Sequence, residues 1–285
     1  MIKGVLKFIP TAVQLAIALS SITLLLAACQ EGSERSASSP IEKTVIDERP
    51  PRMVSAFFGL DNALPPRAVA LSRSAPGRDG MPVTFSRRVV EPIDPTVFTV
   101  VTRSGERYHP LDATTRPADD PAKRHTVLLI GELGDEPEDP PIRVEVTSNL
   151  ALAGDADALG MSVPVTPLVD GPSIVLAYSA SPGQFEKEHP PNTKQIIVVV
   201  WAGGVRPMPG VSTENHRDGY TITTINGDVL PIGIGDLGDN DNYEHIYLDT
   251  ADKPLRVSMR KGLLMDPRDD PNPPTEVEVA GLVSP

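Results

Sequence analysis

The chain lacks several features that would point to a common protein class. It has a single cysteine among 285 residues, so it cannot form an intramolecular disulfide. Aromatic residues make up only 4%, which argues against an extended stacking platform for sugars or bases. The formal net charge of -12 argues against a nucleic-acid partner, because phosphate binding needs a basic face.

Sustained helical periodicity is also missing after the amino terminus, whereas turn residues are abundant. The chain contains 31 prolines and 22 glycines, and short β-branched runs recur between them. This combination favours an all-β architecture. The length allows two domains, each with its own hydrophobic core.

The amino terminus has the pattern of a secretory signal. Lys3 and Lys7 precede an apolar run at 12–28 that ends in small residues. The run is slightly shorter than the ~20 apolar residues that span a bilayer comfortably. Its end, Leu26-Ala27-Ala28-Cys29, resembles the lipobox of bacterial lipoprotein signal peptides.

This resemblance implies that residues 1–28 are removed and that Cys29 is acylated, with palmitate among the expected chains. Several acyl chains together hold a protein stably on a membrane. The alternative is a retained signal anchor with an unmodified cysteine. Gln30 favours sorting to the outer membrane under enteric-type rules, so we expect a lipid-anchored cell-envelope protein facing the periplasm or the surface. Residues 29–52, rich in Ser, Glu, Arg and Pro, predict a disordered tether.

The remainder of the chain repeats itself. Six stretches recur in the same order, most of them about 113 to 122 residues apart. The pairs are 68–71 and 174–178, 83–86 and 199–202, 98–102 and 220–224, 125–129 and 245–249, 141–146 and 254–259, and 162–165 and 276–279. We therefore predict two tandem immunoglobulin-like antiparallel β-sandwiches, at residues 53–168 and 169–285.

The first copy also resembles a known family. Met81-Pro82-Val83-Thr84-Phe85-Ser86, followed by Ile93-Asp94-Pro95, Phe98-Thr99-Val100 and Gly105, is similar to the bacterial immunoglobulin-like domain of S-layer and other envelope proteins. The resemblance implies a structural or adhesive role. It brings no catalytic residues.

Local patterns add three expectations. Asn226-Gly227 predicts a hairpin with a type I′ turn, which needs positive φ at both residues. Pro164 has no N–H to donate and predicts an edge position for its strand. The apolar run at 196–201 predicts a strand that is covered on both faces.

Three loops of the second copy should lie at one end of an antiparallel sandwich, at 202–218, 234–243 and 261–275. All three carry carboxylates, and Ca²⁺ takes six to eight oxygen ligands. We take Asp236, Asp239, Asp241 and Asp269 as candidate calcium ligands. The alternative is that these are ordinary turn residues in water, since Asp, Asn and Gly favour turns for backbone reasons.

Catalytic motifs are missing from the sequence, including a nucleophile elbow, a zinc-protease motif and a phosphate loop. His125 and His245 are expected at equivalent strand starts, which favours a structural role for both. We therefore expect a non-catalytic binding, adhesive or scaffold module whose partners are the membrane, through its lipid, and an envelope protein or glycan. The alternative is an envelope hydrolase that uses loop carboxylates of the second sandwich.

Overall fold

The computed structural model describes residues 49–118, 120–185, 188–238 and 241–281. The predicted signal peptide, Cys29, most of the predicted tether and Asp239 lie outside the described residues. Within the described ranges, no helix is both long enough and apolar enough to cross a membrane.

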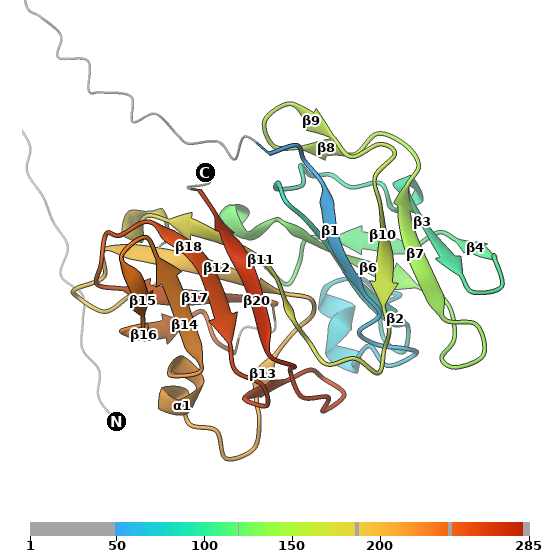
Figure 1. Cartoon of the computed structure of the whole chain (residues 1–285). Helices are drawn as coiled ribbons and strands as arrows, with labels where there is room; N and C mark the ends of the chain where they lie inside the picture. The colour runs from blue at the N-terminus through green and yellow to red at the C-terminus, as the bar shows by residue number, and fades with distance from the viewer. Residues whose placement is uncertain (1–48, 119, 186–187, 239–240, 282–285) are drawn as a thin grey trace, which may run out of the picture. The chain divides into compact units, whose positions relative to one another are not determined.

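The first half of the chain forms a curled sheet of eight strands, drawn from blue to yellow-green in Figure 1. Its order is β4-β3-β7-β10-β1-β2-β6-β5. The strands are β1 (Met53–Phe57), β2 (Asp79–Phe85), β3 (Phe98–Thr102), β4 (Arg107–Tyr108), β5 (Asp112–Thr114), β6 (Thr126–Gly131), β7 (Pro141–Val146) and β10 (Ser162–Thr166). A small hairpin of β8 (Ala151–Leu152) and β9 (Ala156–Asp157) precedes β10.

The second half repeats this arrangement with the order β15-β14-β18-β20-β11-β12-β17-β16. Its strands are β11 (Ile174–Ala180), β12 (Gln195–Trp201), β14 (Tyr220–Thr224), β15 (Gly227–Val229), β16 (Gly233–Gly235), β17 (Tyr243–Leu248), β18 (Pro254–Met259) and β20 (Thr275–Ala280). The short β13 (Arg206–Pro207) pairs with β19 (Leu264–Met265). The chain is thus an all-β protein of two sandwiches, and both have the same strand order.

The helices are single turns or little more, because prolines and turn residues interrupt the chain so often. They are η1 (Pro66–Ala70), η2 (Pro95–Val97), η3 (Pro121–Lys123), η4 (Pro182–Gln184) and α1 (Thr213–Arg217). All four 3₁₀ helices carry proline in their first turn, where its missing N–H costs no hydrogen bond.

The first predicted repeat pair is wrong in the first sandwich. Residues 68–71 lie in and after η1, whereas the strand equivalent to β11 is β1. In each sandwich this first strand pairs antiparallel with the next strand and parallel with the last one. Pro65 and Pro66 direct the chain into the helical turn instead, and Ala68 packs on Ile130 at the outer face of β6.

The predicted equivalence of His125 and His245 is also wrong. Thr84 on β2 pairs with Thr126, and Val200 on β12 pairs with Tyr243. In this register His125 corresponds to Asn242, the residue before Tyr243. The two histidines are thus three residues out of register, and the strand pairing, rather than a shared residue type, fixes which positions are equivalent.

Pro164 does not mark an edge strand, since β10 lies between β7 and β1. Residues 162–164 pair with β7, and Val165 and Thr166 pair with β1. The strand therefore changes partner at Pro164, which is where a missing N–H costs least.

The hairpin of β14 and β15 is present, but its type I′ turn is not. Thr224 pairs with Gly227, so the two turn residues are Ile225 and Asn226. Gly227 has a φ of 127°, whereas Asn226 is not among the described non-glycine residues with positive φ.

Strand β12 is covered on both faces, as its apolar run predicted. Ile197, Val199 and Trp201 pack in the core of the second sandwich. The alternate residues Ile196, Val198 and Val200 pack in a separate cluster that includes Ala118 and Ala122 of the first sandwich. Ala118 and Ala122 thus cover part of the outward face of β12, and this apolar contact helps to hold the two sandwiches together.

Candidate functional site

The junction of the two sandwiches holds a buried ionic cluster centred on Lys123. The lysine ends η3, whose first turn is fixed by Pro121 and by Asp120, whose side chain accepts the N–H of Ala122 at 2.8 Å. Its Nζ forms ion pairs with Asp236 and, at 3.0 Å, with Asp241, both from the loop between β16 and β17. The three side chains are 0% to 1% exposed.

The surroundings of this cluster are apolar and aromatic. Lys123 Nζ lies 5.8 Å from the centroid of the Tyr243 ring, and the ring of Phe185 lies 4.2 Å from that of His245. His245 Nε2 is 3.4 Å from a carboxylate oxygen of Asp236. Burial, the largest influence, lowers the pKa of Lys123, but the two carboxylates outweigh it and the pKa lies above its ordinary value.

Hydrogen bonds between the sandwiches surround the cluster. The hydroxyl oxygen of Tyr243 accepts the backbone N–H groups of His125 and Thr126, each at 3.0 Å. Asn242 donates from its amide nitrogen to Thr126 Oγ1 at 3.1 Å, and Tyr178 donates to the carbonyl of Ala122 at 3.0 Å. The described residues belong to one compact unit, which agrees with a junction of this kind.

His125 is fully buried beside these contacts. Its Nδ1 lies 3.1 Å from the carbonyl oxygen of Phe85, a distance at which a neutral imidazole donates its N–H. Burial lowers the pKa of His125 to about 4. The ring is therefore neutral near physiological pH.

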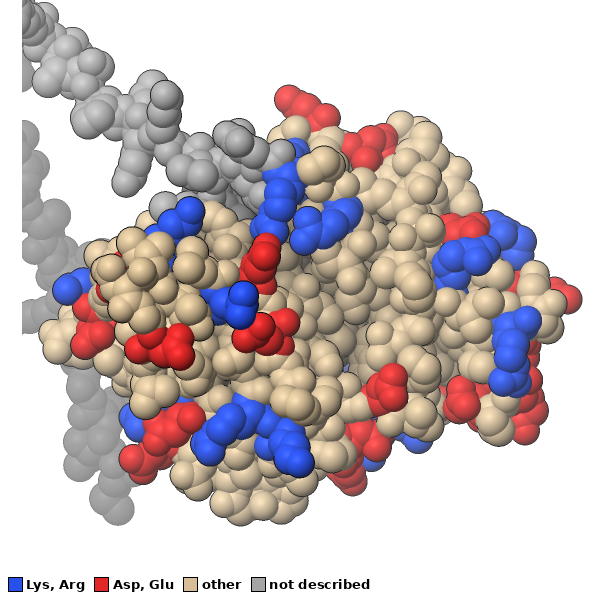
Figure 2. All heavy atoms as spheres, in the orientation of Figure 1, with Lys and Arg blue, Asp and Glu red and all other residues tan. Residues whose placement is uncertain are grey.

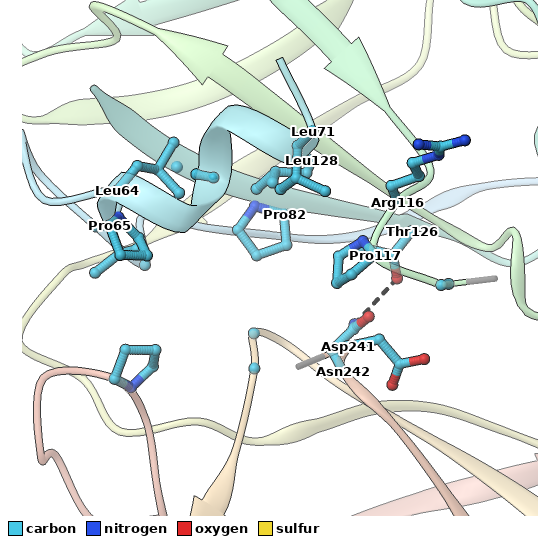
Figure 3. A pocket seen from close by; sticks show the side chains of 18 of the residues that line it. Leu64, Pro65, Leu71, Pro82, Arg116, Pro117, Thr126, Leu128, Asp241 and Asn242 are labelled. Carbon is cyan, nitrogen blue, oxygen red and sulfur yellow. Dashed lines mark hydrogen bonds between the residues drawn. The ribbon is translucent and has the colours of Figure 1, made fainter. Parts of the chain in front are cut away.

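A cavity of about 350 Å³ adjoins the junction. Figure 3 shows its apolar wall, which is formed by Leu64 and Leu71 next to η1 and by Pro82 and Leu128 on β2 and β6. At one end of the cavity lie Thr126, Asp241 and Asn242, with the hydrogen bond between Asn242 and Thr126 drawn as a dashed line. An apolar cavity with a few polar groups at one end is typical of a small-molecule site.

The two sandwiches approach closely beside this cavity at Phe57 and Gly203, which both line it. A Cβ atom at Gly203 would lie 2.9 Å from Cδ1 of Phe57, closer than real contacts allow. Gly203 is therefore required for the close packing of the first sandwich on the second.

The candidate calcium ligands separate into two groups. The structure brings Asp236 and Asp241 together, but around the ammonium of Lys123, which supplies the positive charge that was assigned to a metal ion. Asp269 instead pairs with Arg206 at the surface, and Asp239 lies outside the described residues. Among the described residues, no group of three His, Cys, Asp or Glu side chains could hold a metal ion.

Sequence reasoning missed Lys123 altogether. The stretch Pro121-Ala122-Lys123-Arg124 reads as an exposed basic turn, and only the packing of the second sandwich buries the lysine. A local signal was present in Asp120-Pro121, which predicts a helical turn. Nothing in the sequence pairs that turn with a loop more than a hundred residues away.

A second buried polar group lies inside the second sandwich. The carboxylate of Glu244 accepts a hydrogen bond from Trp201 Nε1 at 3.3 Å and from the Tyr220 hydroxyl, and it lies 3.2 Å from His216 Nε2. His216 belongs to α1, whose first turn is capped by the Ser212 side chain. This group attaches the loop that contains α1 to the sandwich core.

The face in Figure 2 shows no large patch of charge of one sign. Basic and acidic side chains are interspersed there, and large uncharged areas separate them. The junction is therefore the strongest candidate site on chemical grounds. Searches of known protein families and of curated protein sequences found no match to this chain.

Proposed function

We propose that this chain is a lipid-anchored cell-envelope protein that works as a non-catalytic binding module, with the cavity at the junction as its ligand site. The cavity is the observation that carries the proposal. Its apolar wall favours a ligand with an apolar body, and the polar side chains of Thr126, Asp241 and Asn242 line one end.

The position of the cavity supports a binding role. Its lining residues come from both sandwiches, for example Leu128 from the first and Gly204 from the second. A site shared between two packed units is a common place for a ligand. The rigid β frameworks on either side preorganise it.

The state of the loop carboxylates supports the non-catalytic reading. A general acid or base must reach a substrate, and Asp236 and Asp241 are buried against Lys123. Asp269 is paired with Arg206. Each of these three aspartates therefore has a cationic partner, and they do not form the free carboxylate pair that the hydrolase alternative needs.

The binding site is tested with a photoreactive apolar probe that carries one polar end. The intact lipoprotein in its own membranes is irradiated with the probe, and adducts are mapped by mass spectrometry. We expect adducts near Leu71 and Leu128 and a loss of labelling in Leu128→Trp, which fills the cavity. The matched control is Leu230→Trp, at a leucine that is 60% exposed on the second sandwich. An unchanged amount of labelling in Leu128→Trp would contradict the assignment of the cavity as the binding site.

The anchor is tested separately by metabolic labelling with a palmitate analogue. The motivating observation is the lipobox-like Leu26-Ala27-Ala28-Cys29. We expect label on the wild-type protein and none on Cys29→Ala. An unlabelled wild type, or a labelled Cys29→Ala variant, argues against lipid anchoring at this residue.

A further inference from the structure

The ammonium of Lys123 and the carboxylate of Asp236 are in contact at a buried site. The lysine belongs to the first sandwich and the aspartate to the second, and both side chains are 0% exposed. A second carboxylate, Asp241, lies 3.0 Å from the same Nζ and is 1% exposed. These three groups are the components required to form and cleave an amide bond.

We propose that Lys123 and Asp236 form an autocatalytic isopeptide bond that joins the two sandwiches covalently, with Asp241 as the proton-transfer group. The proposal is independent of what the cavity binds. It makes the junction a modification site, since the chain alone supplies every reacting atom.

Contact between the ammonium and the carboxylates allows the first step. The two carboxylates favour the charged amine at rest. Direct proton transfer from the ammonium to Asp236 gives the reactive minor form, which removes the desolvation cost of that charged pair. The transfer yields a neutral amine and a neutral carboxylic acid with no exchange of protons with solvent. A neutral lysine amine is a nucleophile, and desolvation is one way in which proteins activate it.

The geometry assigns different roles to the two aspartates. Asp241 is held by the backbone N–H of Tyr243, which donates to Oδ1 at 2.8 Å and leaves Oδ2 facing Lys123. It is positioned to accept a proton from Nζ and return it. Asp236 has a φ of 64°, in the left-handed region that aspartate enters more readily than most residues, and its carboxyl group contacts Nζ beside His245.

The step balances without a co-reactant. The Nζ lone pair attacks Cγ of the protonated Asp236 carboxyl group, and Asp241 takes a proton from the nitrogen. Asp241 then passes that proton to the departing hydroxyl, which leaves as water as the C–N amide bond forms. The starting ammonium and carboxylate become one amide and one water, and Asp241 returns to its carboxylate form. Fixed contact of the reacting groups supplies the proximity that such a reaction requires.

The test is peptide mapping of the purified full chain. Trypsin under denaturing conditions cleaves after a free lysine but not after an acylated one. We expect no cleavage after Lys123, and residues 108–124 joined to residues 218–256 in one species that is lighter than the two peptides by one water molecule. Two separate peptides with full cleavage after Lys123 would overturn the proposal.

Variants assign the roles within the linkage. Lys123→Arg keeps the charge but removes the nucleophile, and we expect no joined species, whereas the exposed Lys261→Arg should retain it. Asp241→Asn keeps the shape of the side chain, and we expect the joined species to be absent or to form at least tenfold more slowly. Full linkage in Asp241→Asn would overturn its assigned role. The wild-type result decides the proposal even if a variant fails to fold.

Discussion

Tyr243 of the second sandwich accepts, through its hydroxyl oxygen, a hydrogen bond from the backbone N–H of His125 in the first sandwich at 3.0 Å. The same oxygen accepts the N–H of Thr126, which begins β6. One side-chain atom thus satisfies two buried backbone donors that belong to the neighbouring sandwich.

The first prediction concerns this oxygen. Tyr243→Phe leaves both N–H groups buried without that acceptor, and an unsatisfied buried donor costs about 1 to 3 kcal/mol. We expect the free energy of unfolding to fall by about 2 to 4 kcal/mol, as measured by denaturation in urea. The control is Tyr108→Phe, at a tyrosine that is 37% exposed, which should change stability little. Equal stabilities for the two variants would contradict the assignment.

The second prediction concerns pH. The pKa of His125 is lowered by burial from 6.5 to about 4 in the folded protein, whereas the unfolded chain titrates near the ordinary value. The unfolded state therefore binds the proton more tightly, and stability is lost as pH falls from about 6.5 towards 4. The loss amounts to about 3 kcal/mol when complete.

His125→Asn tests this dependence, because asparagine stands at the equivalent position in the second sandwich and retains an N–H donor. We expect the curve of stability against pH to flatten between pH 6.5 and 4 in this variant. The exposed His109→Asn variant should keep the slope of the wild type. An unchanged slope in His125→Asn would assign the pH dependence to other groups.

The third prediction concerns Glu244. Glu244→Met removes the acceptor shared by Trp201, Tyr220 and His216, and we expect a loss of about 3 to 5 kcal/mol. Tyr220→Phe removes one donor and leaves the carboxylate with the other two, so a smaller loss of about 2 kcal/mol is expected. Thermal denaturation of the two variants shows which substitution lowers stability more. A larger loss in Tyr220→Phe would argue that ring packing outweighs the carboxylate.

The fourth prediction concerns calcium. Because Lys123 lies between Asp236 and Asp241, we expect the wild-type protein to melt at the same temperature in EDTA and in millimolar Ca²⁺. Lys123→Met leaves two buried carboxylates facing each other, and Ca²⁺ should raise the melting temperature of this variant alone. A calcium-dependent rise in the wild type would support the calcium site predicted from the loops.

The duplicated fold could be predicted because alternation of apolar and polar residues is a local property of a strand. The stretches at β3 and β14, and at β7 and β18, have the same pattern and occupy the same places. The error at residues 68–71 arose where prolines, rather than side-chain alternation, decide the backbone. The displaced histidines show that a single shared residue type is a weaker guide than the register of a whole strand.

The junction could not be predicted, because its groups lie far apart in the chain. Asp236 and Asp241 were predicted as site residues because of their charge. The sequence alone does not show whether two such carboxylates bind a metal ion or a lysine ammonium. The apolar run of β12 predicted that both faces of the strand are covered. It did not predict that the turn η3, which ends at Lys123, contributes to that cover.

The outward face of β12 has a consequence for how such a duplicated chain can change. Ile196, Val198 and Val200 would lose the cover of Ala118 and Ala122 if the second sandwich were separated from the first, and the apolar surface exposed there would promote aggregation. The two halves are therefore no longer interchangeable modules. Recombination that moved either one into another protein would have to bring a substitute cover with it.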